Sequence, residues 1–489
     1  MMGTLGATVQ EITWISTGYI IANVIVMPFT ALLGRMFGQK RVYMACLVLF
    51  LLGSILCGTA RTLPALIFYR VLQGLGAGAL QPTEQAILRQ TFSAKEQGMA
   101  MALFAMAVML GPAIGPTLGG YIVDNYAWPW IFYINVPVGI LGLGMVAAFV
   151  HEDEEIVAQN RALAEAQRKN TDWWGIGLLV AGLCALQYVL EEGQQDDWFE
   201  SAFIVRMAVV SAVCLFLLPF WELAQRDPMM DLRLLLKRNF LMSNVLMFSL
   251  GFVLMGSTLL LPLFVQTLLG YSATQAGMVL SPGGMAILFV MPAVGMLVTR
   301  VDVRWLIIFG LVTGAAALFL YGQVDLQVDY QTVALIRVLQ AVGLAFLFIP
   351  INTAAFTGIP MMKSSSASAI INLSRNLGGS FGIALISSML VQQQQRHQTF
   401  LVAHVGDAVN QPGGVVRQLS QSLMAQGVPA LEAGQQALAQ VYAMVQRQAS
   451  MLAYVDAFRA LGLLFLLLAP VCLLLRRPPA PGKEAIAAH

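Results

Sequence analysis

The segment FYRVLQGLGAGALQP (68–82) places Arg70 inside an otherwise apolar stretch that is long enough to cross a membrane. A related segment, LIRVLQAVGLAFLFIP (335–350), carries Arg337 in the same setting. An ionised guanidinium is costly in hydrocarbon, so arginines in such segments generally line a cavity or carry function. Two matching segments, one in each half of the chain, indicate an internally repeated membrane transporter.

The spacing of other motifs supports the repeat. Gly111 follows Arg70 by 41 residues, and Gly378 follows Arg337 by the same interval. Each glycine lies in a glycine-rich stretch, GPAIGPTLGG (111–120) or RNLGGSFG (375–382). Equal internal distances predict two pseudo-symmetric helical bundles, so Arg337 and Arg375 are candidate counterparts of the motifs in the first half.

The composition indicates an all-α integral membrane protein. Hydrophobic residues make up 58% of the chain and charged residues only 11%, whereas soluble domains carry about a quarter charged residues. A bilayer core is crossed by ~20 apolar residues in a helix. Thirteen spans are predicted. They are 12–33, 42–60, 64–83, 97–120, 130–150, 173–190, 202–223, 240–262, 275–298, 304–322, 332–352, 367–391 and 451–475.

The distribution of basic residues sets the topology. Most loop lysines and arginines, from the GRMFGQKR turn (34–41) to Arg476 and Arg477, fall on one side, which the positive-inside rule makes cytoplasmic. The first span then runs inward and residue 1 lies outside. With an odd number of spans, we expect that an N-terminal helix is absent from this chain.

Four regions are predicted along the sequence. Residues 1–150 form an N-terminal bundle that lacks its first helix, and residues 151–238 form a charged linker with two inserted transmembrane helices. Residues 239–475 form a C-terminal bundle with a long external loop, 392–450, and residues 476–489 form a cytoplasmic tail. The loop carries apolar residues at helical intervals, which predicts two amphipathic helices broken near Gly427–Pro429. Two interpretations stay open for it: a lid packed over the outer mouth, or a docking surface for a partner protein.

Arg70, Gly74 and Gly78 occur at positions i, i+4 and i+8 of one helix face. Small residues let a second helix approach closely, so Arg70 is expected at such a seam near mid-membrane. Its charge could there bias the proton affinity of a carboxylate that moves during transport. The structural alternative is a static arginine bonded to backbone carbonyls or glutamine side chains.

The glycines of GPAIGPTLGG recur with the same spacing and alternate with prolines. Glycine removes side-chain bulk and proline bends a helix, which predicts a kinked, closely packed helix that acts as a hinge or seal. We therefore assign conformational roles to Gly74, Gly78, Gly111, Pro112, Gly115, Pro116, Gly119 and Gly120.

Candidate proton-coupling residues are Arg70 and Glu84. Glu84 lies ~21 Å beyond Arg70 along a helix, so the two cannot pair directly. No carboxylate stands clearly at mid-membrane, and Asp456 is expected to pair with Arg459 at i+3 in the last span.

Substrate contacts are predicted from Trp14, Tyr19 and Asn23 of the first span, with Gln73 in the Arg70 segment. Adaptable methionine and flat aromatic surfaces suit varied hydrophobic ligands, although packing against lipid or core is the alternative for each residue. The sequence shows no metal-ligand spacing, cofactor motif, enzyme-like cluster or nucleic-acid-binding pattern.

Four motifs carry a family resemblance: RVLQG (70–74), GPAIGPTLGG (111–120), WPWIFYINVPVGI (128–140) and RNLGGSFGIA (375–384). They resemble the major facilitator superfamily, and within it the drug:proton antiporters with fourteen spans of the EmrB/QacA branch. The loop end QALAQVYAMVQRQASMLAYVDAF (436–458) is most similar to the EmrB type. The resemblance implies two rocking bundles in the bacterial inner membrane, a periplasmic membrane-fusion adaptor and a TolC-like outer-membrane channel.

This chain departs from the family pattern in three places. We expect that the first helix of the family, with its Asp-Thr-Asn motif, is absent from this chain. Arg35 and Met36 stand where the loop motif commonly has an acidic residue and an arginine, and Pro129 replaces a common arginine. The expected function is proton-coupled export of hydrophobic or amphipathic compounds. The alternative is a proton-driven transporter of a single specific solute.

Overall fold

The computed structural model describes residues 9–92, 96–151, 172–225, 228, 230–360, 363–409 and 414–475. Every regular element among them is a helix. In chain order these are α2 (Val9–Phe37), α3 (Gln39–Thr59), α4 (Leu63–Thr91), α5 (Gln97–Asn125), α6 (Trp130–Tyr133), α7 (Asn135–Phe149), α9 (Trp173–Glu192), η1 (Trp198–Glu200), α10 (Ala202–Ala224), η2 (Leu232–Leu236), α11 (Arg238–Thr267), α12 (Ala273–Leu297), α13 (Val303–Tyr321), α14 (Tyr330–Phe356), α15 (Ser364–Val409), α16 (Val415–Ala425) and α17 (Ala430–Leu473).

The helices confirm the all-α membrane fold. Within the described ranges, eleven helices are long and apolar enough to cross a membrane. All thirteen predicted spans fall on described helices, and the spans at 97–120 and 367–391 fall on α5 and α15, which are not among the eleven. The charged stretch at the start of the predicted linker lies mostly outside the described residues, since residues 152–171 are not described.

Helix starts are set by local capping chemistry. The Ser272 side chain accepts a hydrogen bond from the Gln275 backbone at the start of α12, and Gln275 bonds back to complete a capping box. Asp329 caps α14 in a similar way through the Thr332 backbone. The hydrogen bond from the Thr332 hydroxyl also holds the pKa of the exposed Asp329 carboxyl below its ordinary value. Short polar side chains thus mark the ends of long apolar segments.

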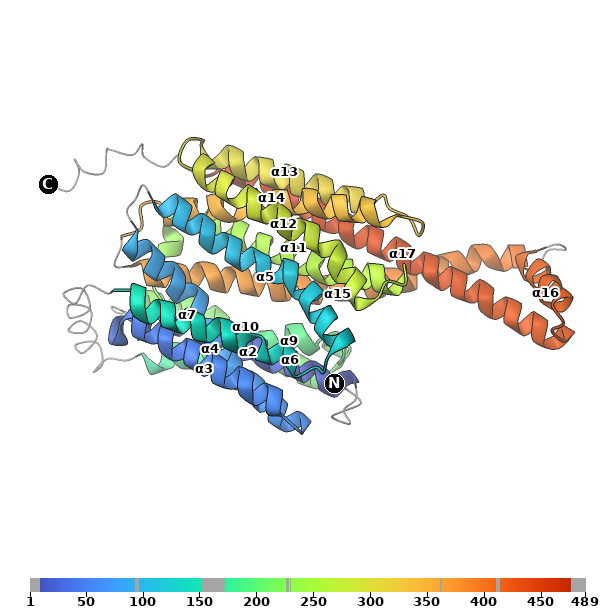
Figure 1. Ribbon diagram of the computed structural model, residues 1–489, viewed down its shortest axis with the longest axis horizontal. Helices are drawn as coiled ribbons and strands as arrows, with labels where there is room; N and C mark the ends of the chain where they lie inside the picture. Colours follow the sequence, from blue (N-terminus) through green and yellow to red (C-terminus); the bar gives the residue numbers. More distant parts are fainter. Residues whose placement is uncertain are drawn as a thin grey trace.

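Figure 1 shows the helices running roughly along the long axis of the molecule. On the N-terminal side, α4 packs against α2 and α3. On the C-terminal side, α11 packs against α15, and α13 packs against α14 and α17. The two sides meet chiefly where α5 lies along α12 and where α2 lies along α15.

The predicted inserted helices form a pair. Helix α9 packs against α10, and it also contacts both α2 and α15. Since α2 belongs to the N-terminal side and α15 to the C-terminal side, α9 touches both.

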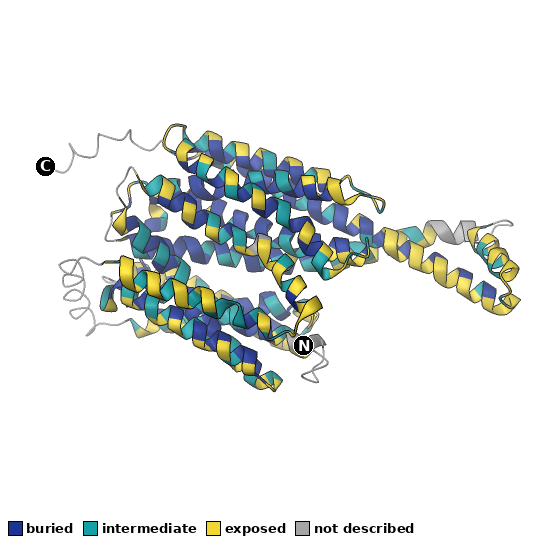
Figure 2. Cartoon of the chain, viewed as in Figure 1, coloured by how far each residue is buried: buried dark blue, intermediate teal, exposed yellow. Residues whose placement is uncertain are grey.

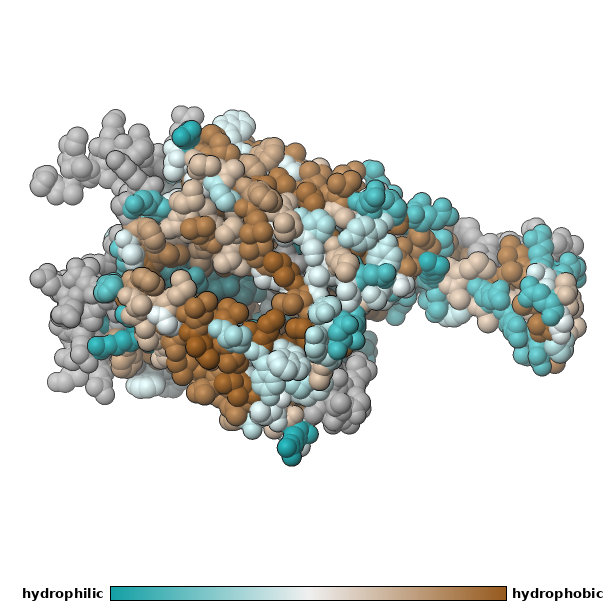
Figure 3. Space-filling model, viewed as in Figure 1, coloured by the Kyte–Doolittle hydropathy of each residue, from teal (hydrophilic) through white to brown (hydrophobic). Residues whose placement is uncertain are grey.

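The distribution of burial fits a lipid environment. The buried residues concentrate among α11–α15 and α17, whereas α7 has no buried residue (Figure 2). Large apolar side chains point outward, including Phe149, which is 76% exposed. Figure 3 shows broad hydrophobic areas over the helical bundle. A soluble monomer rarely exposes apolar surface on this scale, so these faces are suited to lipid.

The external loop carries two helices, α16 (Val415–Ala425) and the outer part of α17, on a helical hairpin formed by α15 and α17. Helix α15 continues to Val409, well beyond the predicted span, and α17 already begins at Ala430. The predicted break is confirmed, because Gly427 has φ 90° and Pro429 is the N-cap of α17. The hairpin projects beyond the bundle in Figure 1, and the main packing of α16 is against α17. The expectation of a lid packed over the outer mouth is therefore wrong for this structure.

Candidate transport site between the two halves

Arg70 lies at the seam between α4 and α2. Its Nη1 donates to the Gln73 side-chain oxygen at 2.8 Å, and its Nε donates to the Ile15 carbonyl at 3.2 Å. The guanidinium stands over the Tyr19 ring, 4.4 Å from the centroid, which is a favourable cation–π distance. Arg70 lies about 10 Å along α4 from its first residue, Leu63, so it stands nearer the N-terminal end of this helix. Its expected position near mid-membrane stays a prediction.

Gly74 and Gly78 make this seam possible. A Cβ atom at Gly74 would collide with the Tyr19 carbonyl oxygen, and one at Gly78 would collide with the Asn23 carbonyl oxygen. The predicted close approach of a second helix is therefore confirmed, and that helix is α2.

Arg337 repeats the local arrangement of Arg70 in different surroundings. Its Nη1 donates to the Gln340 side-chain oxygen at 2.7 Å, matching the Arg70–Gln73 bond. Arg337 is only 3% exposed, and its side chain packs against Gly283 of α12. Its Nε atom has no hydrogen-bond partner among the described residues. The second arginine is thus enclosed within the C-terminal side.

The glycine face of α5 was predicted to be closely packed, and this prediction is wrong for the described residues. A Cβ at Gly111, Gly115 or Gly119 would meet nothing within 4 Å. In α15, by contrast, Gly378 and Gly382 are pressed against backbone of α11. The physical reason for the difference is that no described helix occupies the place beside α5 that α11 occupies beside α15.

The outer end of α5 does pack closely, against α12. Gly120 lies against the Ala273 backbone, and the Thr117 hydroxyl donates to the Gly277 carbonyl at 2.6 Å. A small cavity of about 300 Å³ opens beside this contact. Its lining residues come from α5, α6, α11 and α12 and are Gly119, Gly120, Val123, Ile131, Pro262, Gln266, Ala273, Ala276 and Gly277. The side chains of Pro112 and Pro116 lie outside the described part of the structure.

Polar side chains join the two sides toward the C-terminal end of α4. The Gln85 amide nitrogen of α4 donates to Asn352 of α14 at 2.7 Å. Asn372 of α15 donates to the Gln85 oxygen at 2.8 Å. Arg375 of α15 donates to Gln81 of α4. Sequence reasoning missed these amides, although polar side chains inside apolar spans were an available signal.

Comparison with known proteins assigns this architecture. Residues 1–383 match the family model of the Major Facilitator Superfamily. The chain belongs to the major facilitator superfamily. It is therefore a multi-pass membrane transporter, and this agrees with its helices and their exposed apolar faces.

Bacterial members of the superfamily are similar along most of the chain. The multidrug export protein EmrB of Haemophilus influenzae is 36% identical over 406 residues, covering 82% of this chain and 78% of that protein. The fatty acid resistance protein FarB of Neisseria gonorrhoeae is 31% identical over 477 residues, covering 97% and 90%. The resemblance to the EmrB type is thereby confirmed.

A solved superfamily structure shares the fold. The proton:xylose symporter XylE has a TM-score of 0.57 with 15% identity, covering 94% of this chain and 85% of that one. At this identity the likeness concerns the fold alone.

The four residues predicted to contact substrate do not share one environment in this superfamily member. Tyr19 lies beneath Arg70, and the Asn23 backbone lies against Gly78 of α4. Trp14 is more exposed and pairs with the Tyr188 ring at 5.7 Å. Gln73 is buried and donates to Ser54 of α3, so it faces away from the interface between the two sides.

Two predictions about charged residues have different outcomes. Glu84 is half-buried on α4, within electrostatic range of Tyr43 on α3. A role for Glu84 in proton coupling stays a prediction. The expected pairing of Asp456 with Arg459 is wrong, because Asp456 pairs with His397 of α15 at 2.8 Å. This contact ties α15 to α17 at the base of the hairpin.

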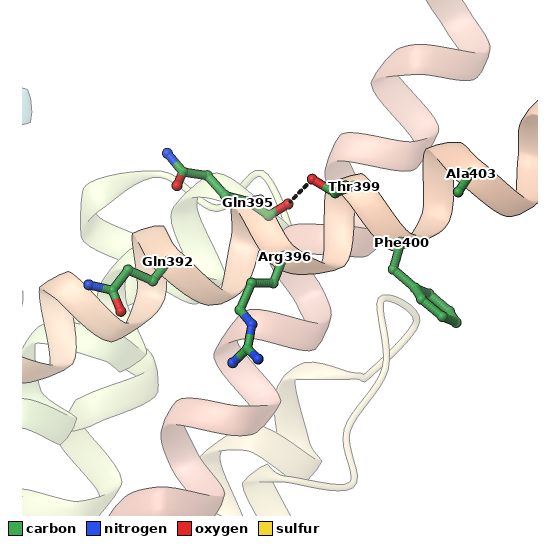
Figure 4. Close-up of a pocket in the computed structure, with 6 residues that line it drawn as sticks. All are labelled: Gln392, Gln395, Arg396, Thr399, Phe400 and Ala403. Carbon is green, nitrogen blue, oxygen red and sulfur yellow. Dashed lines mark hydrogen bonds between the residues drawn. The ribbon is translucent and has the colours of Figure 1, made fainter.

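The outer part of α15 carries a shallow groove of about 670 Å³. Figure 4 shows that Arg396 and Phe400 project from the same side of the helix. The other lining residues are Gln392, Gln395, Thr399 and Ala403. Arginine and aromatic side chains are enriched among the residues that dominate protein interfaces.

Proposed function

We propose that this chain exports hydrophobic or amphipathic drugs across the bacterial inner membrane in exchange for protons. The observation that carries the proposal is the 36% identity over 406 residues to a protein named for multidrug export. FarB, named for fatty acid resistance, adds a second relative whose named compounds are amphipathic. Contacts between the two sides include the Phe104–Phe348 ring pair, Met27 against Asn376, and the Gln85–Asn352 amide bond. Such a mixture suits ligands with an apolar body and a polar end.

In the proposed cycle, residues 1–150 and 239–475 rock against each other. The inserted pair and linker, 151–238, connect them. The bonds of Gln85 to Asn352 and Asn372 close the cytoplasmic side and break when the cavity opens inward. Arg70, held at the α2–α4 seam, biases the group that binds the exchanged proton.

The hairpin supports a role as the pump of a tripartite efflux system. It carries apolar side chains beyond the membrane bundle, including Leu431, which is 80% exposed, and Leu438. Exposed apolar residues in water mark interaction surfaces. In this proposal the hairpin binds a periplasmic membrane-fusion adaptor, which connects the pump to a TolC-like outer-membrane channel.

The test is ethidium accumulation in an efflux-deficient bacterium that expresses the chain with its adaptor. We expect low accumulation that a protonophore restores to the level of the empty strain. Unchanged accumulation in cells with verified membrane insertion would contradict export. Export that persists with the protonophore would contradict proton coupling. Transport of one metabolite and no drug would instead establish a single-solute transporter.

A further inference from the structure

Two carboxylates, one buried and one half-buried, lie at the C-terminal end of the inserted helix α9. Glu191 and Glu192 are its last two residues. Glu192 is only 5% exposed, and its carboxylate accepts a hydrogen bond of 3.0 Å from the Thr17 hydroxyl of α2. Glu191 accepts a bond of 3.1 Å from the amide nitrogen of Gln187. Neither carboxylate forms an ion pair with a described residue.

Gln187 supplies a second observation at this junction. Its side chain is fully buried, and its nitrogen also donates to Ser380 of α15 at 2.6 Å. Its Oε1 atom has no hydrogen-bond partner in the described part of the chain. An ionised carboxylate can only accept hydrogen bonds, whereas a protonated carboxyl has an O–H to donate. A proton on the neighbouring carboxyl would satisfy the Gln187 oxygen.

The surroundings are acidic or neutral. On α9 and the turn after it, the other titratable groups are Cys184, Tyr188, Asp196 and Asp197. Helix α2 presents Thr17 and carries Glu11 near its outer end, and α15 presents Ser380. The cation of α10, Arg206, is exposed, bonds to the Ala202 carbonyl and lies over Phe203. An enclosed carboxylate without a cationic partner is stabilised when it binds a proton.

The location links this pair to the moving parts. Glu192 contacts α2 and Gln187 contacts α15, so the junction spans the N-terminal and C-terminal sides. Arg70 contacts α2 at Ile15 and Tyr19, whereas Glu192 contacts Thr17. Helical geometry places Thr17 about 200° around α2 from Ile15. Helix α2 thus lies between a fixed positive charge and the enclosed carboxylate.

We propose that Glu191 and Glu192 form the proton-binding site of the transport cycle. This assignment rests on the proposed proton-coupled export. A proton from water on the outer side adds to a carboxylate oxygen, and the new O–H donates to the Gln187 oxygen. The carboxyl is then neutral, which changes how α9 holds α2 and α15. Loss of the proton restores the negative charge and returns the contacts of α9 with α2 and α15 to their original state.

The test uses the full chain in proteoliposomes and ethidium as the substrate. Ethidium transport driven by an imposed pH difference is compared with ethidium counterflow in the absence of a gradient. For the double variant Glu191→Gln/Glu192→Gln we expect pH-driven transport to fall about 10-fold or more, with counterflow unchanged. Glu200→Gln, an exposed carboxylate of η1, is the matched control and should retain both activities.

The outcomes separate this assignment from the proposed function. Wild-type protein without pH-driven transport would overturn proton coupling itself and this site with it. A responsive wild type together with an equally responsive double variant would overturn only the site. If the double variant also loses counterflow, the Glu191→Asp and Glu192→Asp variants decide. Recovery of pH-driven transport by these carboxylates supports the site, and its continued loss overturns it.

Discussion

Gln85 of α4 and Asn372 of α15 are hydrogen-bonded at 2.8 Å across the interface, although 287 residues separate them in the sequence. Gln85 bonds in turn to Asn352 of α14. Neutral hydrogen bonds contribute about 0.5–1.5 kcal/mol each to stability, less than bonds to charged groups. These amide bonds can therefore close and still break within a transport cycle more readily than bonds to charged groups such as that of Arg375 to Gln81.

The first prediction concerns this amide junction. Gln85→Leu removes both bonds. The Asn352 Oδ1 then loses its donor, at a cost of about 1–3 kcal/mol for a buried group left unsatisfied, whereas the Asn372 Nδ2 still donates to the Ser368 carbonyl. We expect the closed cytoplasmic side to open more often. Thiol labelling of Ser368→Cys, a buried position on α15, should become several-fold faster in the Gln85→Leu background.

Gln90→Leu is the matched control, because Gln90 is an exposed glutamine on the same helix. It should leave the labelling rate unchanged. Equal rates for Gln85→Leu and wild type would show that the amides do not hold the interface closed.

The second prediction separates the two repeated arginines. Arg70→Ala should abolish drug export while membrane insertion and expression stay normal, because Arg70 is half-buried at a seam between helices. Arg337→Ala should instead lower thermal stability, since it empties an enclosed site. Ethidium efflux and melting temperature in detergent provide the two readouts. Full export by the Arg70→Ala variant would refute its role in coupling.

The third prediction contrasts glycines at two helix surfaces. Gly78→Ala should destabilise the protein by about 1–3 kcal/mol, because the new methyl group would collide with the Asn23 backbone. Gly115→Ala should be tolerated, since no described atom lies within 4 Å of the added carbon. Melting temperatures of the purified variants measure the difference. A larger loss for Gly115→Ala than for Gly78→Ala would reverse the expected order.

The fourth prediction concerns the hairpin. Deletion of residues 405–445 should spare folding of the bundle but break assembly with the adaptor, because α16 packs mainly on α17. Co-purification of the adaptor and the melting temperature measure the two effects. The double substitution Arg396→Ala/Phe400→Ala is a milder variant that changes only the groove in Figure 4. Unchanged adaptor capture by the deletion variant would count against docking.

Local sequence patterns predicted the features that depend on neighbouring residues. Runs of apolar residues located the spans, because a helix in lipid satisfies its own backbone bonds. The spacing of Arg70, Gly74 and Gly78 predicted a close helix seam, and the Gly427–Pro429 pair predicted the turn of the hairpin. Each of these follows from geometry within a single helix or turn.

Features that depend on a distant partner were not predictable in the same way. The spacing of Asp456 and Arg459 allowed a pair on one helix, but His397 approaches from α15 instead. The Gly111 face was expected to be packed, and only the arrangement of whole helices shows that it is open among the described residues. Glu192 sits at the end of a span and gave no local sign of enclosure by Thr17.

Helices α15 and α17 each run without interruption from the bundle into the hairpin, over 46 and 44 residues. At 1.5 Å per residue, α15 is about 69 Å long. A stiff rod of this length amplifies motion: a small tilt of its inner part swings its far end through a much larger arc. In the proposed tripartite system, a protein attached to the hairpin would be pulled or pushed as the C-terminal side moves, so the hairpin would be a mechanical arm as well as a docking surface.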